Sequence, residues 1–128
     1  MREIKFRAWD KSNKIILYTG FIINADGQVA TITNDHDWDL VLMQYTGLKD
    51  KNGFEIYEMD IIKYFMGKIA IIKFGDYMVN GSDYYSNYTK AGFFCEYLNR
   101  ETSGLTTEKN IEIIGNIYEN PELLEDRT

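Results

Sequence analysis

Cysteine, histidine and proline are almost absent from this chain of 128 residues, which contains one of each: Cys95, His36 and Pro121. A single cysteine excludes a disulfide within the chain and a zinc site built from several thiolates. A single histidine likewise excludes a metal site that needs several imidazole ligands. We therefore expect no cofactor, no bound metal and a reduced thiol, as in the cytoplasm.

Long apolar runs and an excess of positive charge are also missing. Apolar runs such as Ile69 to Ile72 span a few residues, whereas a membrane helix needs about 20. The opening residues 1–7 lack the apolar segment of a signal peptide. The chain has 14 basic and 20 acidic residues, and its net charge of −6 gives no global field that attracts nucleic acid. These absences predict a cytoplasmic protein with no membrane partner.

The residues that are present favour one mainly β domain over residues 1–128. Ten Tyr and seven Phe give an aromatic fraction of 15%, which is typical of strands. Apolar and polar residues alternate over Ile4–Trp9, and two nearly continuous apolar runs lie within residues 60–74. Asp26-Gly27 and Asn52-Gly53 are turn signals. Nearly continuous apolar strands indicate burial on both faces, or the strong curvature of a small barrel.

Several segments depart from this simple alternation. Residues 40–44 are compatible with a strand or with a short helical turn. Residues 76–90 are predicted to be a long polar excursion, and residues 99–110 a loop. Gly115, in the last predicted strand, is expected to mark a bulge or a close-packing point. Asn120-Pro121 and the acidic residues that follow predict a short C-terminal helix capped by Asn120.

Three ordered motifs span the chain: Arg2–Asp10, Gln44–Ile61 and Ile114–Leu124. Together they resemble the YopX family of bacteriophage and prophage proteins. The resemblance implies a β-rich fold with an SH3-like barrel element, phage origin and no known activity. Members of that family usually have glycine where this chain has Met59, and methionine disfavours the positive φ that glycine allows. The expected fold is therefore a small SH3-like barrel or roll with extra strands and a short C-terminal helix.

One acidic stretch has the alternation of a hard-cation site. Asp35, Asp37 and Asp39 supply carboxylate oxygens at every second position. An EF-hand loop also needs glycine at its sixth position and glutamate at its twelfth, where this chain has Leu40 and Thr46. A solvated acidic loop is the favoured interpretation.

Two further sets have the residue types of enzyme chemistry. Glu55, Glu58 and Asp60 lie close in sequence and suit a divalent metal, although turn chemistry explains them without one. His36 and Cys95 are the residue types of a base and its nucleophile, but a lone cysteine in a strand is more often a small buried side chain. Neither set completes an active site, and we expect a protein that is not an enzyme.

A nucleic-acid-binding face is the main alternative. Lys5, Arg7 and Trp9 alternate and should share one face of a strand, opposite Ile4, Phe6 and Ala8. Two cations beside an aromatic ring suit phosphates and a stacked base. A plain solvent face explains the same pattern.

Tyrosines in the long excursion form the candidate partner-binding surface. Tyr77, Tyr84, Tyr85 and Tyr88 lie among Asn, Ser and Gly, a composition typical of adaptable recognition surfaces. Alternatively, the excursion packs its own tyrosines.

The charge is unevenly distributed along the chain. Residues 1–14 carry a net charge of +3 and residues 96–128 a net charge of −5. Attraction between these ends makes self-association plausible. We expect a non-catalytic phage accessory protein that forms a homo-oligomer and contacts a host or phage protein.

Overall fold

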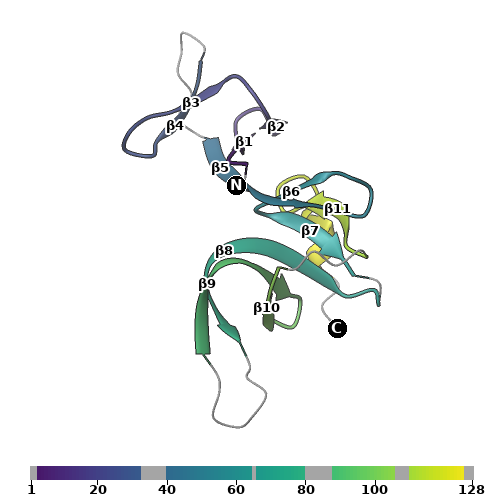
Figure 1. Cartoon of the computed structure of the whole chain (residues 1–128). Helices are drawn as coiled ribbons and strands as arrows, with labels where there is room; N and C mark the ends of the chain where they lie inside the picture. Colours follow the sequence, from purple (N-terminus) through teal and green to yellow (C-terminus); the bar gives the residue numbers. More distant parts are fainter. Residues whose placement is uncertain (1–2, 33–39, 65, 80–87, 106–109, 126–128) are drawn as a thin grey trace.

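The computed structural model describes residues 3–32, 40–64, 66–79, 88–105 and 110–125, which form eleven strands and one short helical turn (Figure 1). The strands are β1 (Phe6–Asp10), β2 (Ile15–Leu17), β3 (Phe21–Ile23), β4 (Val29–Thr31), β5 (Leu40–Lys49), β6 (Glu55–Tyr57), β7 (Asp60–Lys63), β8 (Ile69–Val79), β9 (Tyr88–Tyr97), β10 (Thr102–Gly104) and β11 (Glu112–Asn116). The turn η1 (Pro121–Leu124) is a 3-10 helix.

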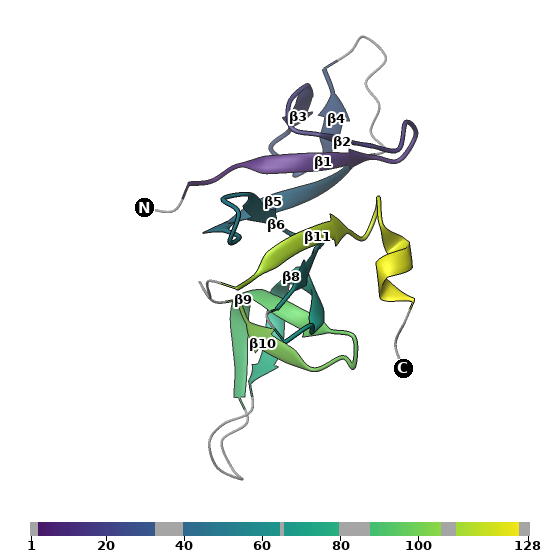
Figure 2. The ribbon, with the colours of Figure 1, turned by 90° about the vertical axis from the view of Figure 1, so that its right-hand side faces the viewer.

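These strands build three antiparallel sheets. The first has the order β2-β1-β5-β6, the second the order β10-β9-β8-β7-β11, and the third is the hairpin β3-β4. Figure 2 shows β1 and β5 on one side of the molecule and β8, β9 and β10 on the other, with β11 between them. The sheets curl into a half-barrel, which confirms the mainly β prediction. Residues 40–44 belong to the long strand β5.

The main apolar core is built mainly on the second sheet. Ile62, Ile72 and Cys95 of that sheet are buried together with Ile56 of β6 and with Ile111, which precedes β11. Both Ile61 and its neighbour Ile62 are fully buried, so β7 has no solvent face over these positions. The first apolar run of residues 60–74 is thus a strand covered on both sides. In the second run, Ala70 and Ile72 are buried, whereas Phe74 is exposed.

Strands β8 and β9 form a long hairpin that corrects the predicted excursion of residues 76–90. Their ladder continues to the pair Val79 and Tyr88, so much of the expected loop is strand. Gly75 faces Gly92 in this ladder, and their φ angles are 147° and 146°, values that only glycine adopts readily. The predicted loop of residues 99–110 also contains a strand, β10, which pairs with β9.

The turn between β6 and β7 joins the two larger sheets. Glu58 donates its backbone N–H to Gln44 O in β5, and Met59 donates its own to Ile72 O in β8. Ile117, beyond β11, donates to Met59 O at 3.0 Å. Met59 has a φ of 67°, so the left-handed conformation that a methionine disfavours is nevertheless adopted. Its two backbone hydrogen bonds hold it there.

Met59→Gly is expected to raise the free energy of unfolding by about 0.5–1 kcal/mol, because glycine adopts a positive φ without the steric cost of a Cβ. Urea unfolding followed by circular dichroism measures the change. Met66→Gly is the matched control, since Met66 is exposed and has no positive φ; glycine there should lower stability slightly. A stability loss in both variants would contradict the expectation.

Asp50 gives the second of the three motifs a structural role. Its Oδ1 accepts the N–H groups of Asn52 and Phe54, both at 2.9 Å, and closes the turn between β5 and β6. Its Oδ2 accepts the N–H of Ile113 in β11 at 3.0 Å. One buried carboxylate thus ties a turn of the first sheet to the edge of the second.

Gly115 lies at a bulge in β11, as the sequence predicts. The register with β7 shifts between Ile113 and Gly115, and Asn120 packs against the site of the missing Cβ. Asn120 does not cap η1 through its side chain, which corrects the predicted cap. Its Oδ1 instead accepts the N–H of Asn116 at 3.2 Å.

No helix in the described part of the chain has the length and apolarity needed to cross a membrane.

Candidate functional site

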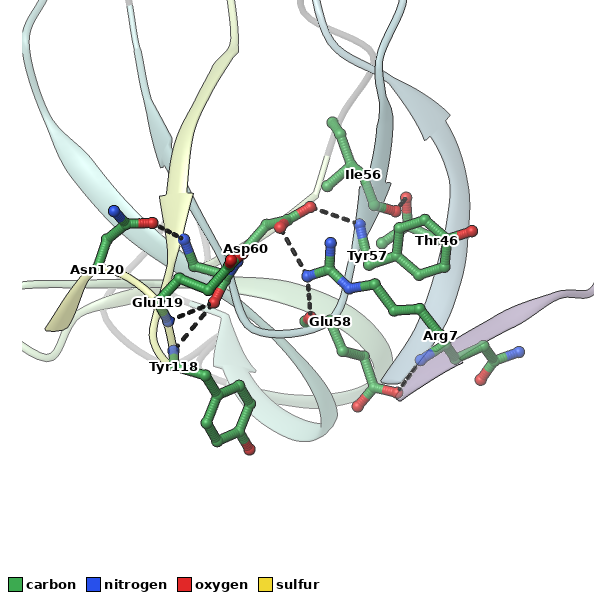
Figure 3. Close-up of polar contacts among 11 residues, drawn as sticks. Arg7, Thr46, Ile56, Tyr57, Glu58, Asp60, Tyr118, Glu119 and Asn120 are labelled. Carbon is green, nitrogen blue, oxygen red and sulfur yellow. Dashed lines mark hydrogen bonds and ion pairs between the residues drawn. The ribbon is translucent and has the colours of Figure 1, made fainter. Parts of the chain in front are cut away.

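A cleft of about 360 Å³ lies where the first and second sheets meet, and an ion pair is among the groups that line it. Arg7 from β1 donates through Nη2 to Asp60 Oδ1 at 2.7 Å and to Glu58 O at 3.3 Å (Figure 3). Asp60 Oδ2 accepts the N–H of Tyr57 at 2.8 Å. The guanidinium lies over the Tyr57 ring, 4.7 Å from its centre. Fifty-three residues separate the two charges in sequence.

The face of Lys5, Arg7 and Trp9 is largely covered, which corrects the expectation of an open strand face at these residues. Arg7 is 4% exposed and Trp9 8% exposed. Trp9 stacks on Tyr118 with ring centres 5.4 Å apart. Lys5 lies 5.1 Å from the Tyr45 ring centre and pairs with Glu3 and Glu55. Arg7 and Trp9 are therefore not part of an open strand face.

Burial governs the electrostatics of this centre. It raises the pKa of Asp60, although Arg7 and the Tyr57 N–H both act to lower it. Burial also raises the pKa of Glu58, against the lowering effect of the Gln44 N–H. The pair of Asp60 and Arg7 therefore lies in a low-dielectric environment. Removing either partner there would leave the other as an uncompensated buried charge.

Glu55, Glu58 and Asp60 do not converge on a common point. Glu55 pairs with Lys5, Glu58 Oε1 accepts the Gln44 N–H at 2.8 Å, and Asp60 is bonded to Arg7. Over the residues that the structure describes, no group of three or more metal-ligating side chains gathers. The metal-enzyme interpretation of these three carboxylates is corrected accordingly.

The rim of the cleft is aromatic and acidic. Tyr18 and Phe54 are 61% and 66% exposed, although both are large apolar rings. Glu119 lies at the same cleft, with Oε1 accepting from Asn116 Nδ2 at 2.7 Å. Asn116 Oδ1 in turn accepts the Glu119 N–H at 2.9 Å, which fixes this carboxylate in place. Sequence reasoning missed these rim residues because they come from three separate segments that no motif connects.

Cys95 is a core side chain. It is fully buried, and its Sγ lies 3.1 Å from Tyr64 Oη. His36, its possible catalytic partner, lies outside the described residues, as do Asp35, Asp37 and Asp39.

The structure describes two of the four tyrosines of the candidate partner-binding surface. Tyr77 is half-buried and stacks on Phe94 with ring centres 5.0 Å apart, beside a hollow of about 650 Å³. Tyr88 begins β9 opposite Val79. Tyr84 and Tyr85 lie outside the described residues. For Tyr77, packing within the hairpin is the role that the structure assigns.

Fold and cleft together define a mainly β protein whose two larger sheets are joined by a buried ion pair. The profile described as "YopX protein" matches residues 5–125, and the chain therefore belongs to the YopX family. It is also similar to protein EF1440 from Enterococcus faecalis, whose crystal structure covers 98% of this chain at 30% identity. The match includes 100% of that chain and has a TM-score of 0.63. A search of curated proteins gave no match.

Proposed function

We propose that this protein is a non-catalytic accessory protein of a phage or prophage, which acts by binding and associates with copies of itself. Family membership supports the phage origin, and with it a place in the cytoplasm of a bacterial host. The observation that carries self-association is the exposed apolar edge of the hairpin β3-β4.

This hairpin exposes isoleucines on its outer strand. Ile22 and Ile23 in β3 are 43% and 40% exposed, and Ile32, next to β4, is 60% exposed. Val29 and Ala30 in β4 are buried, so β4 faces the body of the protein and β3 lies outside it. Among the described strands β3 pairs with β4 alone. A two-stranded sheet of this kind is marginally stable by itself in water.

The edge also lacks the charges that prevent strand pairing. Residues 15–25 carry no charged side chain, the longest such stretch in the chain. Edge strands usually carry lysine, proline or a bulge that keeps other chains away. We infer that β3 pairs with β3 of a second copy, antiparallel and about a two-fold axis, so that each copy covers the isoleucines of the other.

Ile22→Lys is expected to convert the protein to a monomer, because a lysine on the edge strand brings a charge into the shared interface. Sedimentation velocity over a concentration series measures the change as a rise of at least about tenfold in the dimer dissociation constant. Circular dichroism and thermal unfolding check that the fold is intact.

Ile4→Lys is the matched control for this experiment. Ile4 is 66% exposed but lies outside the hairpin, so this variant adds the same charge and should associate like the wild type. A wild-type protein that stays monomeric at high micromolar concentration would rule out self-association. Equal weakening by both substitutions would place the interface elsewhere.

A further inference from the structure

We propose that the cleft between the two larger sheets binds an arginine or lysine side chain presented by an extended segment of a partner protein. Nothing in the self-association of β3 requires this site, because β3 does not line the cleft. The proposal stands on the charge of the cleft, on its two exposed rings and on one buried donor.

The charge of the cleft is negative. Within the part of the chain that the structure describes, Glu55, Asp60 and Glu119 line it against a single cation, Arg7. Arg7 is engaged by Asp60, and Glu55 by Lys5, which leaves Glu119 as the carboxylate without an ion-pair partner among the described residues. Its Oε1 is bound to Asn116, so the carboxylate is held at the rim, and no ion pair within the described residues competes with an incoming cation.

The aromatic rings complete a site for a cation. Tyr18 and Phe54 are each more than 60% exposed at the mouth of the cleft, and Tyr57 lies deeper, where it meets Tyr18 edge-on at 6.1 Å. A guanidinium or ammonium group is attracted to such ring faces, most of all beside a carboxylate. The protein already uses this arrangement internally, where Arg7 lies over Tyr57 and is bonded to Asp60.

A buried donor indicates that the cation arrives on a peptide. Arg7 Nε is buried and has no hydrogen-bond partner within the described chain, although the side chain lines the cleft. A buried N–H without an acceptor is destabilising, and a carbonyl oxygen of a bound peptide would supply the acceptor. A free amine or guanidinium ion offers no such oxygen. A peptide segment supplies both the cation for the cleft and an acceptor for the Arg7 N–H.

The test uses the full-length protein labelled with ¹⁵N and the peptide acetyl-Gly-Arg-Gly-amide. Amide resonances of Tyr18, Phe54, Gly115 and Glu119 are expected to shift during titration, with a dissociation constant on the order of 1 mM at low salt. The citrulline peptide, which has the same shape without the charge, should bind at least about fivefold more weakly. Ethylguanidinium, which lacks the carbonyls, should also bind more weakly than the arginine peptide.

Glu119→Gln separates the specific site from general attraction to an acidic protein. Glutamine keeps the oxygen that accepts from Asn116 but removes the charge, so we expect about a fivefold loss of affinity for the arginine peptide. Glu125→Gln removes the same charge from an exposed position outside the cleft and should have little effect. Ile22→Lys should leave peptide binding unchanged.

Four results would overturn the proposal. The first is an absence of shifts at the cleft residues, and the second is equal binding of the arginine and citrulline peptides. The third is an equal loss of affinity in Glu119→Gln and Glu125→Gln, which would indicate nonspecific attraction. Ethylguanidinium binding as tightly as the peptide would show a site for small cations and overturn the assignment to a protein segment.

Discussion

Arg7→Met is expected to lower the free energy of unfolding by about 3–5 kcal/mol at pH 7, the largest effect of any substitution considered for this protein. Methionine keeps the length of the aliphatic stem, so the change mainly removes the guanidinium. Asp60 would then remain buried without its ion-pair partner, and Glu58 O would lose a hydrogen bond. Urea unfolding followed by circular dichroism measures the loss.

The loss of unfolding free energy caused by Arg7→Met should become smaller as the pH falls. Burial already raises the pKa of Asp60 above its ordinary value of 3.8, and loss of Arg7 raises it further. A folded-state carboxyl group with a raised pKa binds its proton before the unfolded chain does. Stability therefore rises as the pH falls from 7 through the folded-state pKa, more in the variant than in the wild type. Glu58 contributes in the same direction to both proteins, so the difference between them reports on Asp60.

Two further variants separate the ion pair from other effects. Arg7→Met with Asp60→Asn should be more stable at pH 7 than Arg7→Met alone, because the substituted amide is neutral and its oxygen still accepts from the Tyr57 N–H. Lys51→Met removes a cation from the exposed pair with Glu112 and should cost less than about 1 kcal/mol. A loss of similar size in Lys51→Met and Arg7→Met would contradict the importance of burial.

Gly115→Ala is expected to cost about 1–3 kcal/mol, although a single methyl group is added. The new Cβ would lie 2.5 Å from Asn120 Oδ1, 2.7 Å from its Cγ and 2.9 Å from its Cβ. Asn120 must therefore move, and the Asn116 N–H would lose its acceptor. Thermal and urea unfolding both report the change.

A double-mutant cycle tests whether Asn120 causes this loss. Asn120→Gly removes all three atoms that the new methyl group would meet, so Gly115→Ala should cost at least about 1 kcal/mol less in that background. Gly104→Ala is the control, since its Cβ would meet only the end of the Tyr77 side chain, with the hydroxyl at 3.0 Å, and that end can shift. Strict additivity in the cycle would exclude the contact with Asn120 as the cause.

The period-two alternation of apolar and polar residues predicted strands in both of the larger sheets. The continuous apolar run through Ile61 and Ile62 indicated a strand buried on both faces or strongly curved, and a glycine in a strand indicated a bulge or close packing at Gly115. The same patterning failed for β1, whose two faces are both covered. Alternation shows which side chains share a face; it does not show whether another element covers that face.

The candidate site was the least predictable part of the molecule. The sequence indicated Arg7 as a candidate phosphate ligand and Asp60 as a candidate metal ligand. Their partnership depends on a contact across 53 residues, which neither propensity nor spacing encodes. No sequence pattern indicated Glu119 or Phe54 as site residues, because the rim of the cleft forms only when three separate segments of the chain come together.

The amino-acid sequence by itself determined the strand-rich class, the turn at Asn52-Gly53, the bulge at Gly115 and the family of the chain, since each depends on local backbone preference or on residue order. Only the tertiary structure decided that Arg7 is a buried partner of Asp60 and that Met59 adopts a positive φ. Those outcomes depend on which surfaces meet when the sheets curl, and the free energy of burying a charge depends on the whole surrounding protein.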